Sequence, residues 1–268
     1  MIYLKTDDEI DMMRAAGSVV GSIFYDLSEV IKPGVSTQEV NDFIESRIRG
    51  AGMEPTFLGY NGFPASACVS LNEEIVHGIP QADRLMQEGD IVGVDIGATY
   101  AGWVADAART YPVGEVSEKA ARIIEVCRNS FFAGLAHCRA GCRLGDIGHA
   151  IQTVAEAEGF SVVRDLVGHG VGRRMHEDPQ VKNYGPAGKG VKLLKGMALA
   201  IEPMINEGVY DTETLQDDWT VVTADGGLSA HYENTVVITD GDPELITLDE
   251  RETAGEYTGR GAWQRKTS

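Results

Sequence analysis

The sequence is poor in basic residues and has no long apolar stretch. Its 268 residues include 23 Lys and Arg against 41 Asp and Glu, which gives a formal net charge of −18. A general nucleic-acid-binding protein would instead carry a basic stripe. No apolar stretch approaches the length of a membrane span. The N-terminal segment becomes acidic within seven residues, unlike a secretory signal. We therefore expect a cytoplasmic protein.

Cysteine is scarce and lacks the spacing of metal or redox motifs. The four residues Cys68, Cys127, Cys138 and Cys142 include no CxxC pair, and a chain of this length without a secretory signal has little need of disulfides. Cys127 and Cys138 fall in a helical, Ala- and Ile-rich stretch, where a small buried apolar side chain is the expected role. The sequence therefore predicts neither a cysteine-based zinc site nor a cysteine nucleophile.

Hydrophobic residues make up 43% of the chain, enough for a substantial core in one large domain or two small ones. Several helix starts are marked by capping residues that precede apolar residues at helical spacing. We expect helices to begin after Thr6 with Glu9, after Ser36 with Glu39, after Ser117 and from about Asp146, the last of them ending at Gly159.

Residues 32–53 resemble residues 139–160 at a fixed offset of 107. The apolar positions of the two segments coincide, but those of many pairs of amphipathic helices would do so too. Two glycine pairs also coincide, Gly34 with Gly141 and Gly52 with Gly159, and these are stronger evidence for a repeat. We therefore expect an α+β fold of two similar halves, with helices covering a curved antiparallel sheet and a site where the halves meet.

No Pro-, Gly- or Ser-rich linker separates the halves. We expect one domain over residues 1–250, with halves of about 1–113 and 114–250. The polar segment 251–268 is expected to be a flexible tail.

Asp95 and Asp106 lie in a segment that has the pattern of a β-hairpin. If the hairpin folds about the Tyr100–Ala101 bond, residues whose numbers sum to 201 lie opposite each other, and these two aspartates meet that condition. Opposed Cβ atoms lie about 4.5–5.5 Å apart, where like charges destabilise a sheet unless a cation lies between them. A divalent metal would be such a cation. The alternative is two aspartates on a solvent-exposed face.

Other potential metal ligands follow along the chain. His169 and His176 lie in a Gly-rich, turn-prone stretch. Glu202 follows the apolar run 197–201 and precedes a proline, which marks a strand end. Glu233 lies in another apolar strand, and either glutamate would be costly to bury without a cation. Each residue alone has an ordinary structural explanation, but together they indicate a metal site.

Taken in order, Asp95, Asp106, His169, Glu202 and Glu233 resemble the five metal ligands of the methionine aminopeptidases. The resemblance extends over residues 5–248, through the motifs NEEIVHGIP, VDIGATYAGWVADAARTY, GHGVG, MHEDP, IEP and SAHYENT. It implies the pita-bread fold of the creatinase and aminopeptidase family, with two divalent metals in a cleft between the halves. The short spacing between Glu202 and Glu233 is similar to that of the type I bacterial form.

The resemblance also implies a role for each ligand. Asp106 and Glu233 would bridge the metals, Asp95 would chelate one, and His169 would bind the other. Glu202 would bind a metal and move a proton from the nucleophile to the leaving amine. Four carboxylates balance the charge of two divalent ions, which could be Co, Mn, Fe or Zn. Such a pair of ions would activate a water for amide hydrolysis.

Further residues match those that contact substrate in this family. His77 and His176 would hydrogen-bond the substrate, with His176 helping to stabilise the oxyanion. The methionine side chain would lie in a pocket whose aromatic walls suit a thioether, lined by Phe57, Tyr60, Phe63, Cys68, Met175 and Trp219. Without the resemblance, these aromatic residues would be read as core.

The chain departs from the common family pattern at four positions. Phe57 replaces a frequent Cys, Met175 a frequent aromatic residue, and Asn234 a frequent His. His231 stands where Gln is more frequent, and we expect it to orient a ligand carboxylate.

The expected function is removal of the initiator methionine from nascent chains with a small second residue. The enzyme would be a monomer with transient ribosome association, without sequence-specific nucleic-acid or membrane binding. One alternative is a proline-directed peptidase of the same fold, although such relatives carry a large N-terminal domain. Another is a binding module that has lost catalysis, although such proteins lose metal ligands. A phosphate loop at 168–172 is disfavoured by its GxGxG spacing.

Overall fold

The computed structural model describes residues 1–249 and 251–252. Its helices are α1 (Asp7–Leu27), α2 (Thr37–Gly50), α3 (Glu118–Leu135) and α4 (Leu144–Ala157), with a short 3-10 turn at Tyr60–Gly62. The strands of the first half are β1 (Glu54–Pro55), β2 (Ala67–Leu71), β3 (Glu74–Val76), β4 (Ile91–Tyr100) and β5 (Trp103–Pro112). Those that follow are β6 (Ser161–Val162), β7 (Gly168–Gly170), β8 (Glu177–Val181), β9 (Ala198–Ile201), β10 (Met204–Asn206), β11 (Thr212–Thr214), β12 (Val221–Thr223), β13 (Ser229–His231), β14 (Glu233–Val237) and β15 (Glu244–Leu245).

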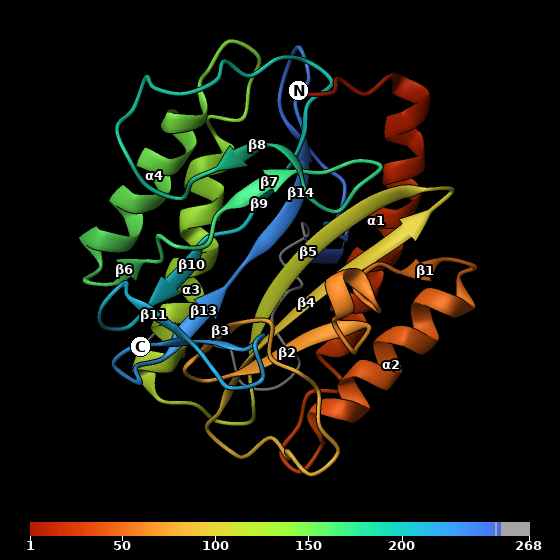
Figure 1. Ribbon diagram of the computed structural model, residues 1–268. Helices are drawn as coiled ribbons and strands as arrows, with labels where there is room; N and C mark the ends of the chain where they lie inside the picture. Colours follow the sequence, from red (N-terminus) through yellow and green to blue (C-terminus); the bar gives the residue numbers. More distant parts are fainter. Residues whose placement is uncertain (250, 253–268) are drawn as a thin grey trace.

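A nine-stranded antiparallel sheet runs through the molecule in the order β1-β4-β5-β14-β9-β7-β8, with β2 added to β4 and β15 to β14. The two halves join where β5 pairs with β14. Helices α1 and α2 lie beside β4 and β2, and α3 and α4 lie beside the second half (Figure 1). The predicted α+β fold is confirmed, and the sheet brings strands of both halves together in the middle of the molecule.

Hydrophobic side chains fill the space between the helices and the sheet. One cluster includes Phe24 of α1 and Ile44 of α2, packed with residues of β2, β4 and β5. A second includes Phe131 of α3 and Ile151 of α4, packed with residues of β9 and β14. Each helix pair thus covers the strands of its own half. The predicted boundary between residues 113 and 114 stays a prediction.

The predicted repeat extends to the backbone hydrogen bonds. Helix α4 begins and ends 107 residues after α2. At the same offset, Gly34 N–H donates to the Met86 carbonyl and Gly141 N–H to the Leu193 carbonyl. Both glycines have a positive φ, of 87° and 100°, which a side chain would strain. The strand pairs repeat as well, with Glu54 opposite Thr99 and Ser161 opposite Asn206.

The helix starts agree closely with the sequence. Thr6 and Ser36 form capping boxes with Glu9 and Glu39, and the Ser117 hydroxyl accepts a hydrogen bond from the Ala120 N–H. The fourth helix begins at Leu144, before the expected Asp146. Asp146 acts from the third helical position, where its carboxylate accepts the Arg143 N–H at 2.8 Å.

The hairpin register differs from the sequence prediction. Tyr100 pairs with Trp103, so opposed residue numbers sum to 203. The turn is made by Ala101 and Gly102, both at positive φ (48° and 79°), as a two-residue type I′ turn requires. The prediction that Asp95 and Asp106 lie directly opposite each other was therefore wrong. They are diagonal neighbours on the same face, because a shift of two residues preserves the alternation of a strand.

Of the predicted tail at 251–268, only residues 251–252 lie within the described part of the chain. The Glu252 side chain is buried, with a carboxylate oxygen 3.4 Å from the Arg109 guanidinium.

Candidate metal centre

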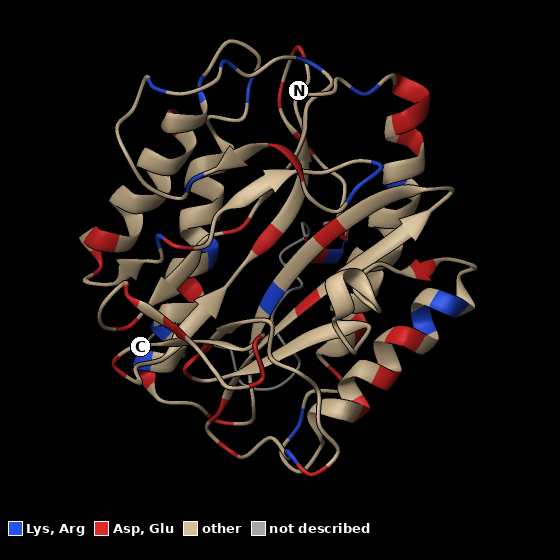
Figure 2. Ribbon diagram, in the orientation of Figure 1, with Lys and Arg blue, Asp and Glu red and all other residues tan. Residues whose placement is uncertain are grey.

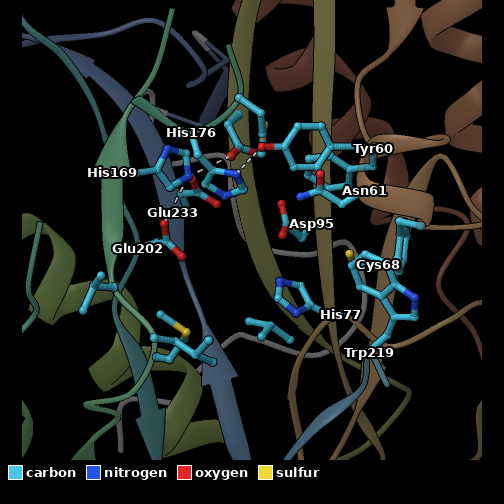
Figure 3. A pocket seen from close by; sticks show the side chains of 18 residues that line it. Tyr60, Asn61, Cys68, His77, Asp95, His169, His176, Glu202, Trp219 and Glu233 are labelled. Carbon is cyan, nitrogen blue, oxygen red and sulfur yellow. Dashed lines mark hydrogen bonds and ion pairs between the residues drawn. The ribbon is translucent and has the colours of Figure 1, made fainter. Parts of the chain in front are cut away.

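Five adjacent strands carry the predicted ligands to one face of the central sheet. Asp95 lies on β4, Asp106 on β5, His169 on β7 and Glu233 at the start of β14, and Glu202 directly follows β9. The strand register places these residues at the same level of the sheet. Ala108 of β5 pairs with Asp95 on one side and with Glu233 on the other, and His169 pairs with Ala200 of β9. Figure 2 shows acidic positions within β5 and β14 in the middle of the sheet, and Figure 3 shows the side chains converging on one cavity.

The donor atoms have the spacing of a metal site. Ligand atoms of Asp106, His169 and Glu233 all lie within 4.8 Å of one another. His169 Nε2 lies 3.6 Å from Asp106 Oδ2 and 3.5 Å from Glu202 Oε1. These distances are too long for hydrogen bonds. Two ligands at 2.0–2.2 Å from one ion in tetrahedral geometry lie about 3.4 Å apart, so an ion fits between them.

Within the described part of the chain, three of the buried carboxylates each have one oxygen without a hydrogen-bond partner. Among the described residues, Asp95 Oδ1, Asp106 Oδ1 and Glu233 Oε1 accept no hydrogen bond. Asp106 is 2% exposed and Glu233 is 1% exposed. Burying an unpaired charge costs roughly several kcal/mol of folding free energy. These oxygens therefore require either protons or cations. The residues present therefore fit divalent metal ions.

The titration of these groups reflects the same burial. Burial raises the pKa of Asp95 to about 7. Burial, together with the neighbouring carboxylates, raises the pKa of Asp106, Glu202 and Glu233 well above the usual range. Burial also lowers the pKa of His169 to about 4, with a smaller contribution from His176. Metal binding at this centre therefore replaces protons on the carboxyl groups.

A cavity of about 240 Å³ opens beside the donor cluster. All eight residues predicted to contact substrate line it: Phe57, Tyr60, Phe63, Cys68, His77, Met175, His176 and Trp219. Phe63 and Trp219 pack edge to face at 5.1 Å, and Phe57 is held against Gly97, where a Cβ would lie only 2.6 Å from the Phe57 ring. The wall is thus aromatic and rigid.

Sequence reasoning missed several residues of the wall, namely Asn61, Val76, Leu166, Val167 and Met204. Four of them are apolar, and an apolar side chain near a strand gives no sign of whether it faces a cavity or the core. Asn61 carries a signal in the sequence, because the Asn61-Gly62 pair favours a turn, and in the structure it has a positive φ of 49°.

The two histidines expected to contact substrate, His77 and His176, approach the cavity from different halves. The Tyr60 hydroxyl is 2.8 Å from His176 Nδ1, and the His176 ring packs against that of His169 with centroids 4.3 Å apart. His77 faces Trp219 edge-on and has a positive φ of 60°. Burial lowers the pKa of both His77 and His176, which keeps each ring neutral near pH 7.

A buried cation lies behind the ligands. Arg109 of β5 is fully buried between the rings of Phe24 and Tyr232, at 4.9 and 4.4 Å from their centroids. Its guanidinium donates to the Glu233 carbonyl and, at 2.8 Å, to Asn234 Oδ1. Asn234, one of the four departures, thus helps to hold the start of β14.

Comparison with known proteins identifies the family. The model of metallopeptidase family M24 matches residues 11–240. The chain belongs to this family. It is 52% identical to a methionine aminopeptidase of Clostridium acetobutylicum over 250 residues, covering 93% of this chain and 100% of the relative. It is 49% identical to methionine aminopeptidase 1 of Bacillus subtilis over 247 residues, covering 92% and 99%.

Solved structures agree with this assignment. The methionine aminopeptidase of Thermotoga maritima matches with a TM-score of 0.91 and 44% identity, covering 93% of this chain and all of that one. A prolidase from Pyrococcus furiosus matches with a TM-score of 0.74 and 22% identity, and this chain covers 66% of it, so that likeness concerns the fold alone. The pita-bread fold and the predicted resemblance to methionine aminopeptidases are confirmed. Within the described residues, none of the helices combines the length and apolarity needed to span a bilayer.

Proposed function

We propose that this protein removes the N-terminal methionine from nascent chains whose second residue is small. The observation that carries this proposal is an aromatic-walled cavity that all five proposed ligands also line, three of them with donor atoms close enough to share an ion. A narrow apolar cavity accepts one unbranched side chain, and its aromatic rings favour a thioether. The relatives that match over nearly their whole length are named methionine aminopeptidases.

The proposed centre holds two divalent ions, taken from Mn, Fe, Co or Zn according to supply. Asp95, Asp106, His169, Glu202 and Glu233 would together hold these ions. When bound, such ions would polarise the scissile carbonyl and lower the pKa of a water. The four carboxylates match the charge of two such ions.

Glu202 is the proposed proton carrier. Its side chain is 14% exposed and lines the cavity, so it can reach both the donor cluster and a bound peptide. A carboxylate placed there can take a proton from the attacking water and pass it to the leaving amine. The Asn183 side chain donates to the Glu202 carbonyl at 3.0 Å, which fixes the backbone beneath it.

His176 and His77 are proposed to bind the peptide. The Tyr60 hydroxyl engages His176 Nδ1, which leaves Nε2 as the atom that can donate to the developing oxyanion. His77 approaches from the first half and can hydrogen-bond the peptide backbone. Phe57, Phe63, Cys68, Met175 and Trp219 are proposed to enclose the methionine side chain.

The proposal is tested with purified protein on the peptide Met-Ala-Ser, with Xaa-Pro peptides as the comparison, before and after treatment with a chelator. We expect release of methionine from Met-Ala-Ser, its loss with the chelator and its return with Mn²⁺ or Co²⁺. Faster cleavage of Xaa-Pro peptides would instead support a proline-directed peptidase. Activity that survives complete removal of metal would contradict the metal mechanism.

We further propose that the enzyme acts as a cytoplasmic monomer that meets its substrate at the ribosome. The ribosome association is supported by the substrate, because the initiator methionine is first accessible on nascent chains. Co-sedimentation with ribosomes at low and physiological salt tests the association, and light scattering tests the oligomeric state. A stable dimer, or no binding at low salt, would contradict the corresponding part of the proposal.

A further inference from the structure

His231 is a buried histidine at the metal centre that belongs to neither the ligand set nor the cavity wall. It ends β13, two residues before Glu233, and is 3% exposed. Its backbone is fixed on both sides by Thr110, whose hydroxyl accepts from the His231 N–H and donates to the His231 carbonyl, each at 2.9 Å. The backbone position of His231 is therefore fixed, and its ring is buried.

The outer nitrogen of this ring points at two ligand carboxylates. His231 Nε2 lies 4.0 Å from Glu202 Oε2 and 3.9 Å from Glu233 Oε2. Among the described residues it has no hydrogen-bond partner. A buried nitrogen without a partner is unfavourable, because it has lost its hydrogen bond to water. A shift of about 1 Å would bring either carboxylate into hydrogen-bond range.

Glu202 is the more suitable acceptor. Its other oxygen, Oε1, lies 3.5 Å from His169 Nε2, so its carboxylate stands between two imidazoles with one oxygen towards each. Glu202 lies between β9 and β10, outside the strand pairing and with its carbonyl held by the Asn183 side chain, whereas Glu233 is paired with Ala108 of β5. Outside the strands, the Glu202 carboxylate depends more on a side-chain donor for its orientation.

We propose that His231 is a positioning residue for Glu202, donating its Nε2–H to Glu202 Oε2 and so fixing which carboxylate oxygen faces the metal ions. The inference rests on the proposed function, in which Glu202 carries the proton. His231 touches neither substrate nor metal in this arrangement. It acts by limiting the rotation of Glu202, as hydrogen-bond donors behind metal ligands commonly do.

The test compares wild type with His231→Leu, which removes the donor at similar volume, and His231→Gln, which retains an N–H at similar reach. For His231→Leu we expect kcat on Met-Ala-Ser to fall about 10–100-fold with little change in KM, and the dissociation constant for Co²⁺ in calorimetric titration to rise about tenfold. The number of Co²⁺ ions bound should not change. His231→Gln should restore most of both quantities.

Three results would overturn the proposal. The first is a His231→Leu variant with the kcat and Co²⁺ affinity of wild type. The second is loss of one bound Co²⁺ in that variant, which would make His231 a ligand, and the third is a His231→Gln variant as impaired as His231→Leu. If His231→Leu does not fold, His231→Asn replaces it, because its shorter amide cannot reach Glu202 and the same losses are expected. The Co²⁺ titration remains informative even if wild type does not cleave Met-Ala-Ser, a result that would refute the proposed function alone.

Discussion

Asp95 and Glu202 occupy equivalent positions in the two halves, 107 residues apart. The offset is that of the helices α2 and α4 and of the strand pairs β1–β4 and β6–β10. Each half therefore contributes one carboxylate from an equivalent chain position, Asp95 within β4 and Glu202 between β9 and β10, and the pairing of β5 with β14 brings the two halves together. The metal centre depends on both halves being folded.

Replacement of Asp106 by Asn should abolish hydrolysis and metal retention together. A neutral amide would leave the bound ions with one uncompensated positive charge in a buried site. Elemental analysis of the purified variant, alongside peptide cleavage, measures both effects. Asp211→Asn, on an exposed surface position, is the matched control and should retain both. An active Asp106→Asn protein with two bound ions would refute the ligand assignment.

Glu202→Gln should remove most activity, because the amide can neither take up nor deliver the proton. Its single-turnover rate on Met-Ala-Ser, measured at saturating metal, separates the loss of proton transfer from weaker metal binding. Turnover within a few-fold of wild type under these conditions would exclude Glu202 as the proton carrier.

His176→Ala should differ from the ligand variants, because this ring is placed against the substrate. Loss of an oxyanion donor lowers turnover by about 10²–10³-fold. Metal content should hardly change. Tyr60→Phe, which removes only the hydroxyl that holds His176 Nδ1, should give a smaller loss in the same direction. A His176→Ala protein that had lost an ion would show that His176 is a ligand.

The contribution of Asp95 to the stability of the metal-stripped protein should fall as pH rises from about 4 to about 7. The ordinary pKa of an Asp such as Asp95 is 3.8, and burial raises it to about 7 in the fold. Between these values this group binds more protons in the folded state than in the unfolded state, so its contribution to the free energy of unfolding decreases with pH. Buried histidines with a lowered pKa contribute in the opposite direction, so the test compares wild type with Asp95→Asn. Thermal unfolding of both proteins in chelator at pH 5 and pH 7 measures the difference. Asp95→Asn should lose less stability over this range than wild type, and an equal or larger loss would contradict the assignment.

The cavity should discriminate moderately among apolar side chains and strongly against charge. A difference of one methylene-sized group is worth about 1–3 kcal/mol in an apolar pocket, so N-terminal norleucine should be cleaved more slowly than methionine. N-terminal Glu should be rejected, because nothing in the aromatic wall would pair its charge. The measurement is kcat/KM on a matched peptide panel. Faster cleavage of Glu or Ala peptides would overturn the methionine assignment and leave the metal mechanism intact.

The sequence predicted the fold class well because its signals are local. Capping residues and registered glycines fix the helix ends, and the repeat places the two halves. The register of the hairpin was missed because it depends on Ala101 adopting a positive φ, which nothing in the residue type announces. The error was a shift of two residues, so it left both aspartates on the correct face.

The donor cluster was predictable because an acidic residue inside an apolar strand is anomalous without a cation. The contacts between residues far apart in the sequence could not be predicted. Tyr60 and His176 are 116 positions apart, and their hydrogen bond depends on how two loops from different halves meet. The same applies to His231, whose distances to Glu202 and Glu233 are set by the packing of three strands.

The clustering of buried carboxyl groups bears on the order in which the fold and the metal centre form. Four clustered carboxylates would oppose folding in the absence of ions, but the raised pKa of each group means that retained protons offset part of that repulsion. We therefore expect the chain to fold first and to take up its ions afterwards. Cellular metal supply would then set the fraction of molecules that are active and leave the amount of folded protein largely unchanged.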